Sequence, residues 1–160
     1  MMHNLRDFLK SGMLGPGTIG LSPVEVQDRL GKPWDVGGTP RQRIWKYGSI
    51  QLGFERDKPT RTEAVSFIGL YFDDSLALPE LIRQEGWFPA RSTTKEDFIH
   101  YLEEQGICYS ENQQLTFETQ LVLATESGAH VVFDRSGDEV TLDSIQLLQD
   151  PKASKEQMTP

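Results

Sequence analysis

Cysteine is almost absent from this chain, and that shortage excludes several kinds of protein. Cys108 is the only cysteine among 160 residues, so no disulfide can form within the chain and no zinc site can use more than one thiolate ligand. A chain without disulfides suits a reducing compartment. Cys108 stands between Ile107 and Tyr109, and we expect a small apolar residue here rather than a nucleophile.

Long apolar runs are missing as well. No stretch approaches the roughly 20 apolar residues that a membrane-spanning helix needs. The segment 1–17 has no basic start followed by an apolar run, which a secretory signal would show. We therefore expect a cytoplasmic protein.

Positive charge is scarce relative to negative charge. The chain has 16 Lys and Arg against 24 Asp and Glu, which gives a net charge of -8. This excess repels phosphate backbones and anionic membranes, so neither nucleic acid nor a membrane is an expected partner. It favours a basic protein as partner, and a solvated acidic surface without a binding role is the plainer alternative.

Recognisable catalytic motifs are also lacking. His3, His100 and His130 are scattered, no G-x-S-x-G motif is present, and the adjacent acidic pairs lack the D-x-D-x-D-G spacing of a calcium loop. The pattern GxGxxG at 15–20 follows a predicted helix instead of a strand, so we interpret it as a connection and not as a dinucleotide loop. The sequence predicts no catalytic residue, no cofactor and no metal site.

What the chain does contain is a capped helix, a loop and a hairpin, in that order. The segment 22–25, Ser-Pro-Val-Glu, is a capping box with proline at the first helical position, and Gly31 ends the helix. Alternating apolar residues then predict strands at 44–47 and 50–54. The segment 65–72 is apolar on both faces, which is typical of a central strand.

The same order returns in the second half of the chain. A capping box at 93–96 opens a helix that ends at Gly106, and strand patterns follow at 115–123, 129–133 and 140–148. We therefore predict an α+β fold of two helix–β–β–β repeats, with antiparallel sheets and helices packed on one face. A chance similarity between two α+β halves is the alternative.

These patterns divide the chain into four parts within one structural domain. A short helix opened by Asn4, together with a Gly-rich connection, occupies 1–17. The first repeat and a linking helix at 79–85 occupy 18–89, the second repeat occupies 90–149, and 150–160 is expected to be a disordered tail.

The first repeat resembles a known bacterial module. Val24-Glu25-Val26, Leu30-Gly31-Lys32-Pro33 and Trp45-Lys46-Tyr47-Gly48 match the module of the small outer-membrane assembly lipoprotein. Two such units in tandem are similar to the β-lactamase inhibitory proteins, which grip an enzyme with an open sheet face. This resemblance implies a binding fold. The lipoprotein's secretion signal and the inhibitor's disulfides have no counterpart here, so location and partner are not implied.

Large aromatic residues on open sheet faces and in loops commonly anchor protein interfaces. Core positions are the alternative for Trp45 and Phe67, and for Trp34 and Trp87 the two interpretations are equal. Acidic side chains could contact the basic partner next to these aromatic residues. The candidate partner-binding residues are Trp34, Trp45, Tyr47, Phe67, Tyr71, Asp73, Asp74, Trp87, Glu103 and Glu104.

These observations favour a non-enzymatic binding protein. Its most concrete version is a bacterial immunity or inhibitor protein that neutralises a basic toxin or enzyme domain by direct binding, an expectation drawn by analogy. A small enzyme or ligand-binding domain with a pocket between the repeats is the alternative from another class, and a scaffold component is a third.

Overall fold

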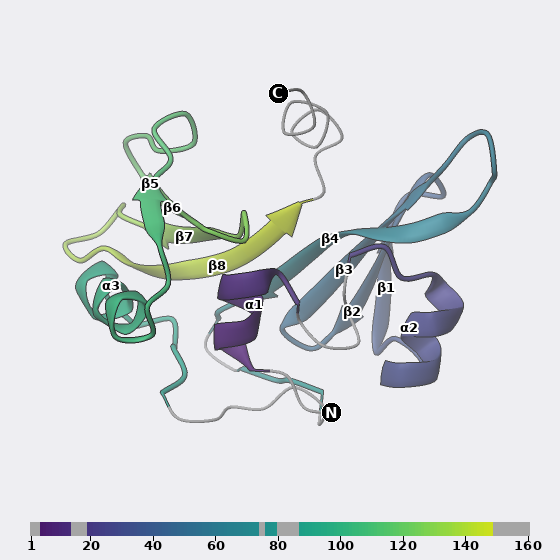
Figure 1. Cartoon of the computed structure of the whole chain (residues 1–160), viewed down its shortest axis with the longest axis horizontal. Helices are drawn as coiled ribbons and strands as arrows, with labels where there is room; N and C mark the ends of the chain where they lie inside the picture. The colour runs from purple at the N-terminus through teal and green to yellow at the C-terminus, as the bar shows by residue number, and fades with distance from the viewer. Residues whose placement is uncertain (1–3, 14–18, 74–75, 80–86, 149–160) are drawn as a thin grey trace.

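In the part of the chain that the structure describes, four antiparallel strands from each half join into one eight-stranded sheet, and three helices lie on one of its faces (Figure 1). The computed structural model describes residues 4–13, 19–73, 76–79 and 87–148. The strands lie in the order β1-β2-β3-β4-β8-β7-β6-β5. The elements are α1 (Leu5–Ser11), α2 (Pro23–Leu30), β1 (Asp35–Gly38), β2 (Gln42–Tyr47), β3 (Ile50–Arg56), β4 (Glu63–Tyr71), α3 (Lys95–Glu104), β5 (Tyr109–Glu111), β6 (Gln120–Thr125), β7 (His130–Asp134) and β8 (Thr141–Leu148).

The predicted fold, two helix–β–β–β repeats with antiparallel sheets and helices packed on one face, is wrong, because the strands form one eight-stranded sheet. Each half contributes four strands, because β1 and β5 escape the apolar pattern that reveals the others: β1 is rich in glycine and β5 has three residues. The strand expected at 115–123 begins only at Gln120. The two halves share one sheet because β4 and β8 pair with each other.

The pairing of β4 with β8 is the seam between the halves. Leu70 lies opposite Ile145, Gly69 opposite Gln146 and Ile68 opposite Leu147. A lone sheet half would leave β4 and β8 as edges with unpaired backbone groups, so joining them satisfies both. The boundary predicted near residue 89 stays a prediction.

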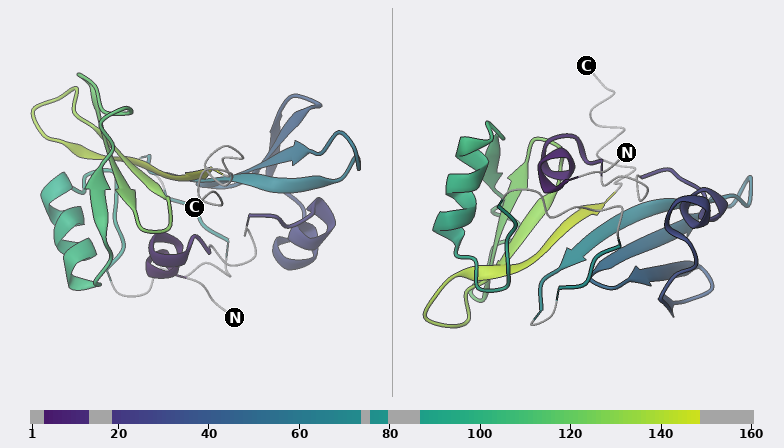
Figure 2. Two further views of the ribbon diagram at one scale, coloured as in Figure 1. Left: turned by 45° about the horizontal axis from the view of Figure 1, so that its top comes forward. Right: turned by 90° about the horizontal axis from the view of Figure 1, so that it is seen from below.

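The hydrophobic core lies between the sheet and the helices and runs through both halves. Phe8 and Leu9 of α1, Val26 of α2, and Phe98 and Leu102 of α3 are fully buried. Figure 2 shows all three helices on the same side, while the outer strands of both halves rise away from them. The uncovered face of the sheet is therefore concave across the strands.

The local signals placed the helices well. Asn4 caps α1, and Ser22 with Glu25 forms the predicted capping box of α2. For α3 the cap is Thr94, whose hydroxyl accepts a hydrogen bond from the Asp97 N–H. The capping box predicted at 93–96 is thus replaced by a single N-cap at Thr94.

Several predictions lie wholly or partly outside the described residues: most of the GxGxxG connection, the linking helix beyond residue 79, and the tail 150–160. Within the described part of the chain, no helix combines the length and apolar character needed to cross a membrane.

Candidate functional site

The candidate site is the sheet face against which none of the described helices packs, named here the open face (Figure 2). Because successive side chains of a strand point to opposite faces, the pairing register assigns each side chain to one face. The main side chains on the open face are Gln42, Ile44, Lys46, Gln51, Phe67, Tyr71, Val122, His130, Val132, Asp134, Ser144, Gln146 and Leu148.

An aromatic pair occupies the centre of the open face. Phe67 and Tyr71 flank Gly69 on β4, and their rings lean over this glycine. A Cβ added at Gly69 would lie 2.6 Å from Tyr71 Cε2 and 2.9 Å from Phe67 Cζ. The absence of a side chain at Gly69 leaves room for both rings over the backbone of β4, and both aromatic residues are half-buried.

An apolar pocket of about 290 Å³ adjoins this pair on the side of the first half. Ile44, Gly53, Phe67 and Leu148 line it together with neighbouring polar residues of β2 and its preceding turn. Gly53 lies opposite Phe67 on the paired strand, and a Cβ added there would lie 3.0 Å from Phe67 Cβ, so glycine lets Phe67 pack closely against β3. Leu148 is 55% exposed, an unusual state for a leucine on a central strand.

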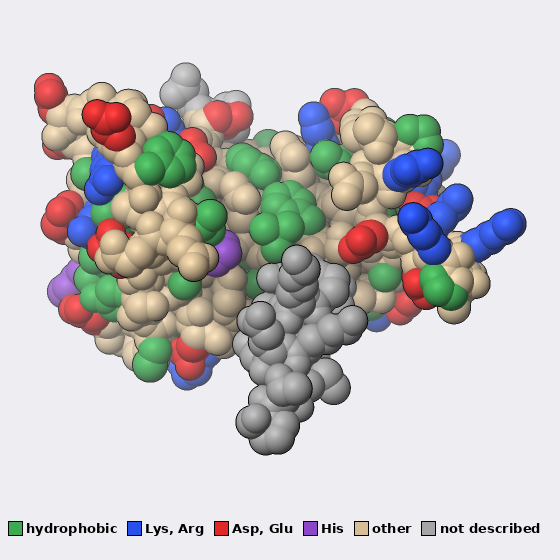
Figure 3. All heavy atoms as spheres, turned by 90° about the horizontal axis from the view of Figure 1, so that it is seen from above, with side chains coloured by type: hydrophobic (Ala, Val, Ile, Leu, Met, Phe, Trp, Pro, Cys, Tyr) green, Lys and Arg blue, Asp and Glu red, His purple; other side chains and the backbone are tan. Residues whose placement is uncertain are grey.

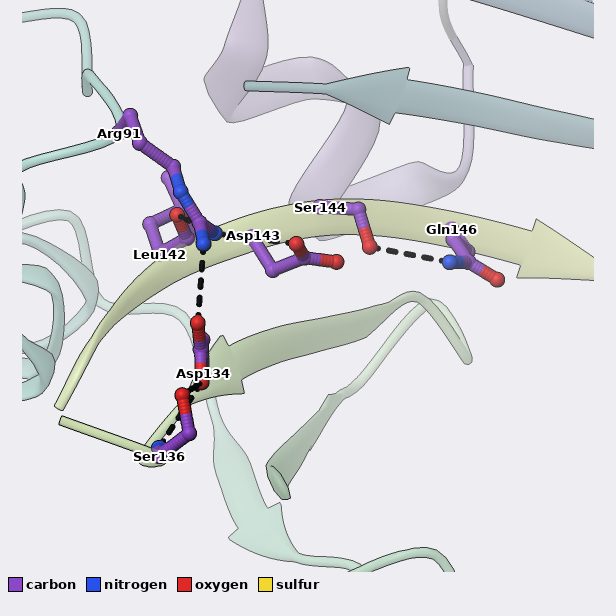
Figure 4. Close-up of polar contacts among 7 residues, drawn as sticks. All are labelled: Arg91, Asp134, Ser136, Leu142, Asp143, Ser144 and Gln146. Atoms are coloured by element: carbon purple, nitrogen blue, oxygen red, sulfur yellow. Dashed lines mark hydrogen bonds and ion pairs between the residues drawn. The ribbon is translucent and has the colours of Figure 1, made fainter. Parts of the chain in front are cut away.

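A charged cluster lies at the other end of the open face, where β7 meets β8 (Figure 4). Arg91 donates hydrogen bonds to the Leu142 carbonyl at 2.9 Å, to Asp143 Oδ1 at 3.0 Å and to Asp134 Oδ2 at 3.0 Å. The pairing register shifts between Val132 and Phe133, which opposes two residues of β8 to one of β7. Arg91 thereby fixes the irregular part of the β7–β8 pair.

Both carboxylates in this cluster add negative charge to the face. Hydrogen bonds from the hydroxyl and backbone N–H of Ser136, and then the Arg91 guanidinium, hold the pKa of Asp134 below its usual value. Burial raises the pKa of the Tyr71 hydroxyl, and the nearby Asp143 charge raises it further. Asp143 directly precedes Ser144, which lies opposite Tyr71 in the β4–β8 pair.

Between the aromatic pair and the charged cluster lies a polar strip. Gln146 donates a hydrogen bond to the Ser144 hydroxyl at 3.0 Å, and His130 lies opposite Gln146 on β7. Burial lowers the pKa of His130, so its imidazole is neutral at physiological pH.

Replacing His130 by Gln should reduce the acid sensitivity of the fold. The pKa of His130 is lower in the folded state than its usual value of 6.5, so the unfolded chain gains a proton first as the pH falls. The contribution of neutral His130 to the free energy of unfolding is therefore lost as the pH falls below 6.5 and through the pKa that His130 has in the folded state. Urea denaturation at pH 7.5 and pH 5 should show a smaller loss in His130→Gln than in the parent.

The exposed helix position Val24 supplies the control for this experiment. Val24→Gln changes no titratable group, so its loss of stability between the two pH values should match that of the parent. Equal losses in His130→Gln and the parent would contradict the proposed titration of His130.

The outer end of the open face in the second half is covered. Val122 and Val132 point away from the helices yet are 1% and 9% exposed. The segment 112–119 folds over them: Thr116 Oγ1 accepts a hydrogen bond from the Val122 N–H, and the Asn112 N–H donates to the Val122 carbonyl. The accessible part of the open face therefore runs from the apolar pocket to the charged cluster.

The charge of the molecule is distributed unevenly between its halves. Residues 87–148 contain 11 Asp and Glu against 3 Lys and Arg, whereas residues 19–73 contain 7 against 8. Figure 3 shows hydrophobic side chains in the middle of the open face and Lys and Arg side chains gathered at the end that carries the β3–β4 turn. The excess negative charge belongs to the half that holds the charged cluster.

The structure brings only part of the predicted aromatic set together. Phe67 and Tyr71 share the open face, as described above. Trp45 is 7% exposed and Tyr47 is fully buried, because both point toward α2, where the Tyr47 hydroxyl donates to the Gly31 carbonyl. These two residues belong to the core and are left out of the site. Trp34 is 57% exposed but lies beside the β2–β3 turn.

Trp87 and the predicted acidic residues do not form one surface with the aromatic pair. Trp87 packs against Tyr101 of α3 with ring centroids 4.6 Å apart, on the helix-covered side. Glu103 accepts a hydrogen bond from Tyr109, and Glu104 pairs with His100 on α3. Asp73 is exposed just after β4, and residue 74 lies outside the described residues.

Sequence reasoning missed several residues that shape the open face, among them Ile44, His130, Asp134, Asp143 and Leu148. The alternation of the apolar core residues 145 and 147 on β8 already separates Leu148 from the core positions. The charge imbalance between the halves was also visible in the sequence. The proximity of Asp143 to Tyr71 depends on the β4–β8 pairing and had no sequence signal.

Comparison with protein families, characterised proteins and solved structures finds no significant match to this chain. The resemblance to the lipoprotein module and to the inhibitory proteins stays a prediction. Among the described residues, no group of three or more His, Cys, Asp or Glu side chains is placed to hold a metal ion.

Proposed function

We propose that this chain is a non-enzymatic binding protein that neutralises a basic toxin or enzyme domain by covering it with the open face. The observation that carries the proposal is the aromatic pair, Phe67 and Tyr71, at the centre of a concave sheet face (Figure 2). Rigid aromatic side chains with few rotatable bonds bury a large area on binding at a small entropic cost.

Two further features support a basic partner. The second half of the molecule carries nearly all of the excess negative charge, which accelerates encounter with a positively charged surface. Asp134 and Asp143 place part of that charge at the end of the open face. An immunity protein is the concrete form of this function, because neutralising a toxin requires only tight coverage of its active surface.

The proposal is tested by affinity capture with variants of the open face. The tagged parent, Phe67→Asp and Val24→Asp are exposed to lysate of the native host at low and at high salt, and retained proteins are identified by mass spectrometry. We expect one stoichiometric basic protein with the parent, and at least about tenfold less of it with Phe67→Asp, since a charge would be buried in the contact.

Val24 is the matched control because it is 70% exposed on α2, on the other side of the sheet. Val24→Asp should retain the partner like the parent, and high salt should weaken retention throughout. If Phe67→Asp retains the partner fully and Val24→Asp loses it, the interface lies elsewhere on the molecule. A partner that is acidic, or retention of nothing at low salt, would overturn the proposed function.

A further inference from the structure

We infer that the open face recognises two features of its partner, a large apolar side chain in the pocket beside Phe67 and a Lys or Arg side chain next to Asp143. This inference rests on the proposed function and specifies the chemistry of the partner segment. The occupant is an exposed, extended segment of a basic protein, in which these two side chains point the same way.

The apolar pocket fits one large side chain. Its volume is about 290 Å³, which is enough room for one aromatic or leucine side chain. Ile44, Phe67 and Leu148 supply apolar walls, and Gly53 leaves the floor open to close approach. Leu148, which is 55% exposed, would lose most of its contact with water on binding, and burial of apolar surface is favourable.

The charged cluster supplies the second contact. Arg91 pairs with Asp134 and Asp143, so two negative charges share one positive charge. Among the described residues, only one Asp143 oxygen, Oδ1, accepts a hydrogen bond, and the side chain is 48% exposed. An incoming guanidinium or ammonium group can therefore pair with Asp143 and rest against the ring of Tyr71, an arrangement that cations favour.

The spacing of the two contacts defines the segment that fits. Phe67 pairs with Leu148 at the pocket, and Tyr71 pairs with Ser144 beside the charged cluster. These positions are four residues apart along β4, which corresponds to about 13 Å at the rise of a strand. An extended partner segment spans the same distance between residues i and i+4. The face therefore selects a large apolar residue and a basic residue separated by three others.

The test uses blocked five-residue peptides and ¹⁵N-labelled full-length protein. Acetyl-Trp-Ser-Thr-Ser-Arg-amide is titrated at low salt, and amide shifts are followed by NMR. We expect binding in the millimolar range, with the largest shifts at Gly53, Phe67, Gly69 and Asp143. The same peptide ending in Glu should bind at least about fivefold more weakly, and the peptide with Gly in place of Trp should lose the shift at Gly53.

A protein variant provides the matched control. Leu148→Asp changes an exposed wall of the pocket without touching the core and should weaken binding of the Trp–Arg peptide, whereas Val24→Asp should leave it unchanged. The NMR spectrum of each variant also shows whether that variant remains folded, so a loss of binding can be separated from a loss of structure.

Three outcomes of the peptide titration would overturn the inference: equal response to the Arg and Glu peptides, shifts outside the open face, or no shift at the highest soluble peptide concentration. Shifts of the same residues with protein concentration alone would identify a second copy of the chain as the occupant and would also overturn it. If capture still yields a basic protein that depends on Phe67, the proposed function stands without this inference.

Discussion

Replacing Phe98 by Ala is expected to lower the free energy of unfolding by about 3–5 kcal/mol, as for other fully buried phenylalanines. Phe98 is 0% exposed and is the centre of an aromatic group in which its ring meets Trp87 at 5.9 Å, Tyr101 at 6.2 Å and Phe133 at 5.8 Å. Phe133 belongs to β7, so this group fixes α3 to the sheet. Its loss leaves a cavity that rigid neighbouring rings cannot close.

Urea denaturation of Phe98→Ala and the parent measures this effect directly. Phe117, which is 55% exposed, offers a control of the same chemistry, and Phe117→Ala should change stability by no more than about 0.5 kcal/mol. A loss below about 1.5 kcal/mol for Phe98→Ala would contradict the arrangement of α3 against β7.

Gly48→Ala is expected to cost about 2–5 kcal/mol, although it adds a single methyl group. Gly48 begins the two-residue turn between β2 and β3 with φ of +64°, a conformation that costs an L-residue about 1–2 kcal/mol. The added Cβ would also contact the Ala77 carbonyl oxygen and lie 2.7 Å from Trp34 Cζ3. Ala77 is held there by hydrogen bonds with Ser49, so the methyl group has nowhere to go.

The turn before β7 separates the two causes of this cost. Gly128 has φ of +87°, but a Cβ there would meet only Leu147, at 3.9 Å. Gly128→Ala should therefore cost only the backbone strain, about 1–2 kcal/mol. If thermal or urea denaturation gives equal losses for both variants, Ala77 does not pack over the β2–β3 turn.

The predicted site residues show how much of a binding face an alternating sequence pattern can predict. Alternation along β4 placed Phe67 and Tyr71 on the face opposite to Ile68 and Leu70, and the structure agrees. The same alternation could not tell which face of β2 the helices cover. Trp45 and Tyr47 therefore looked like contact residues, although they form part of the core.

The acidic candidates show the limit for charged residues. Glu103 and Glu104 lie on α3, behind the sheet, while the carboxylates that reach the open face, Asp134 and Asp143, come from β7 and β8. Whether a carboxylate contributes to a site depends on which strands lie next to it in the sheet. Those neighbouring strands are set by pairing between residues far apart in the sequence, such as Tyr71 and Ser144.

The sequence by itself determined the local structure. Capping side chains placed α1 and α2 because the hydrogen bonds that start a helix are made within four residues. Apolar alternation placed five strands within two residues of their ends because side-chain direction is a property of the strand itself. The net charge and the single cysteine were equally fixed by composition.

Only the tertiary structure decided that the two halves form one sheet. β1 has almost no apolar pattern and β5 has three residues, so both depend on a neighbouring strand to supply their hydrogen bonds. The seam between β4 and β8 joins residues more than 70 positions apart, and no local signal encodes such a partner. Burying one shared core requires both halves at once, and that requirement creates the open face with Phe67 and Tyr71 at its centre.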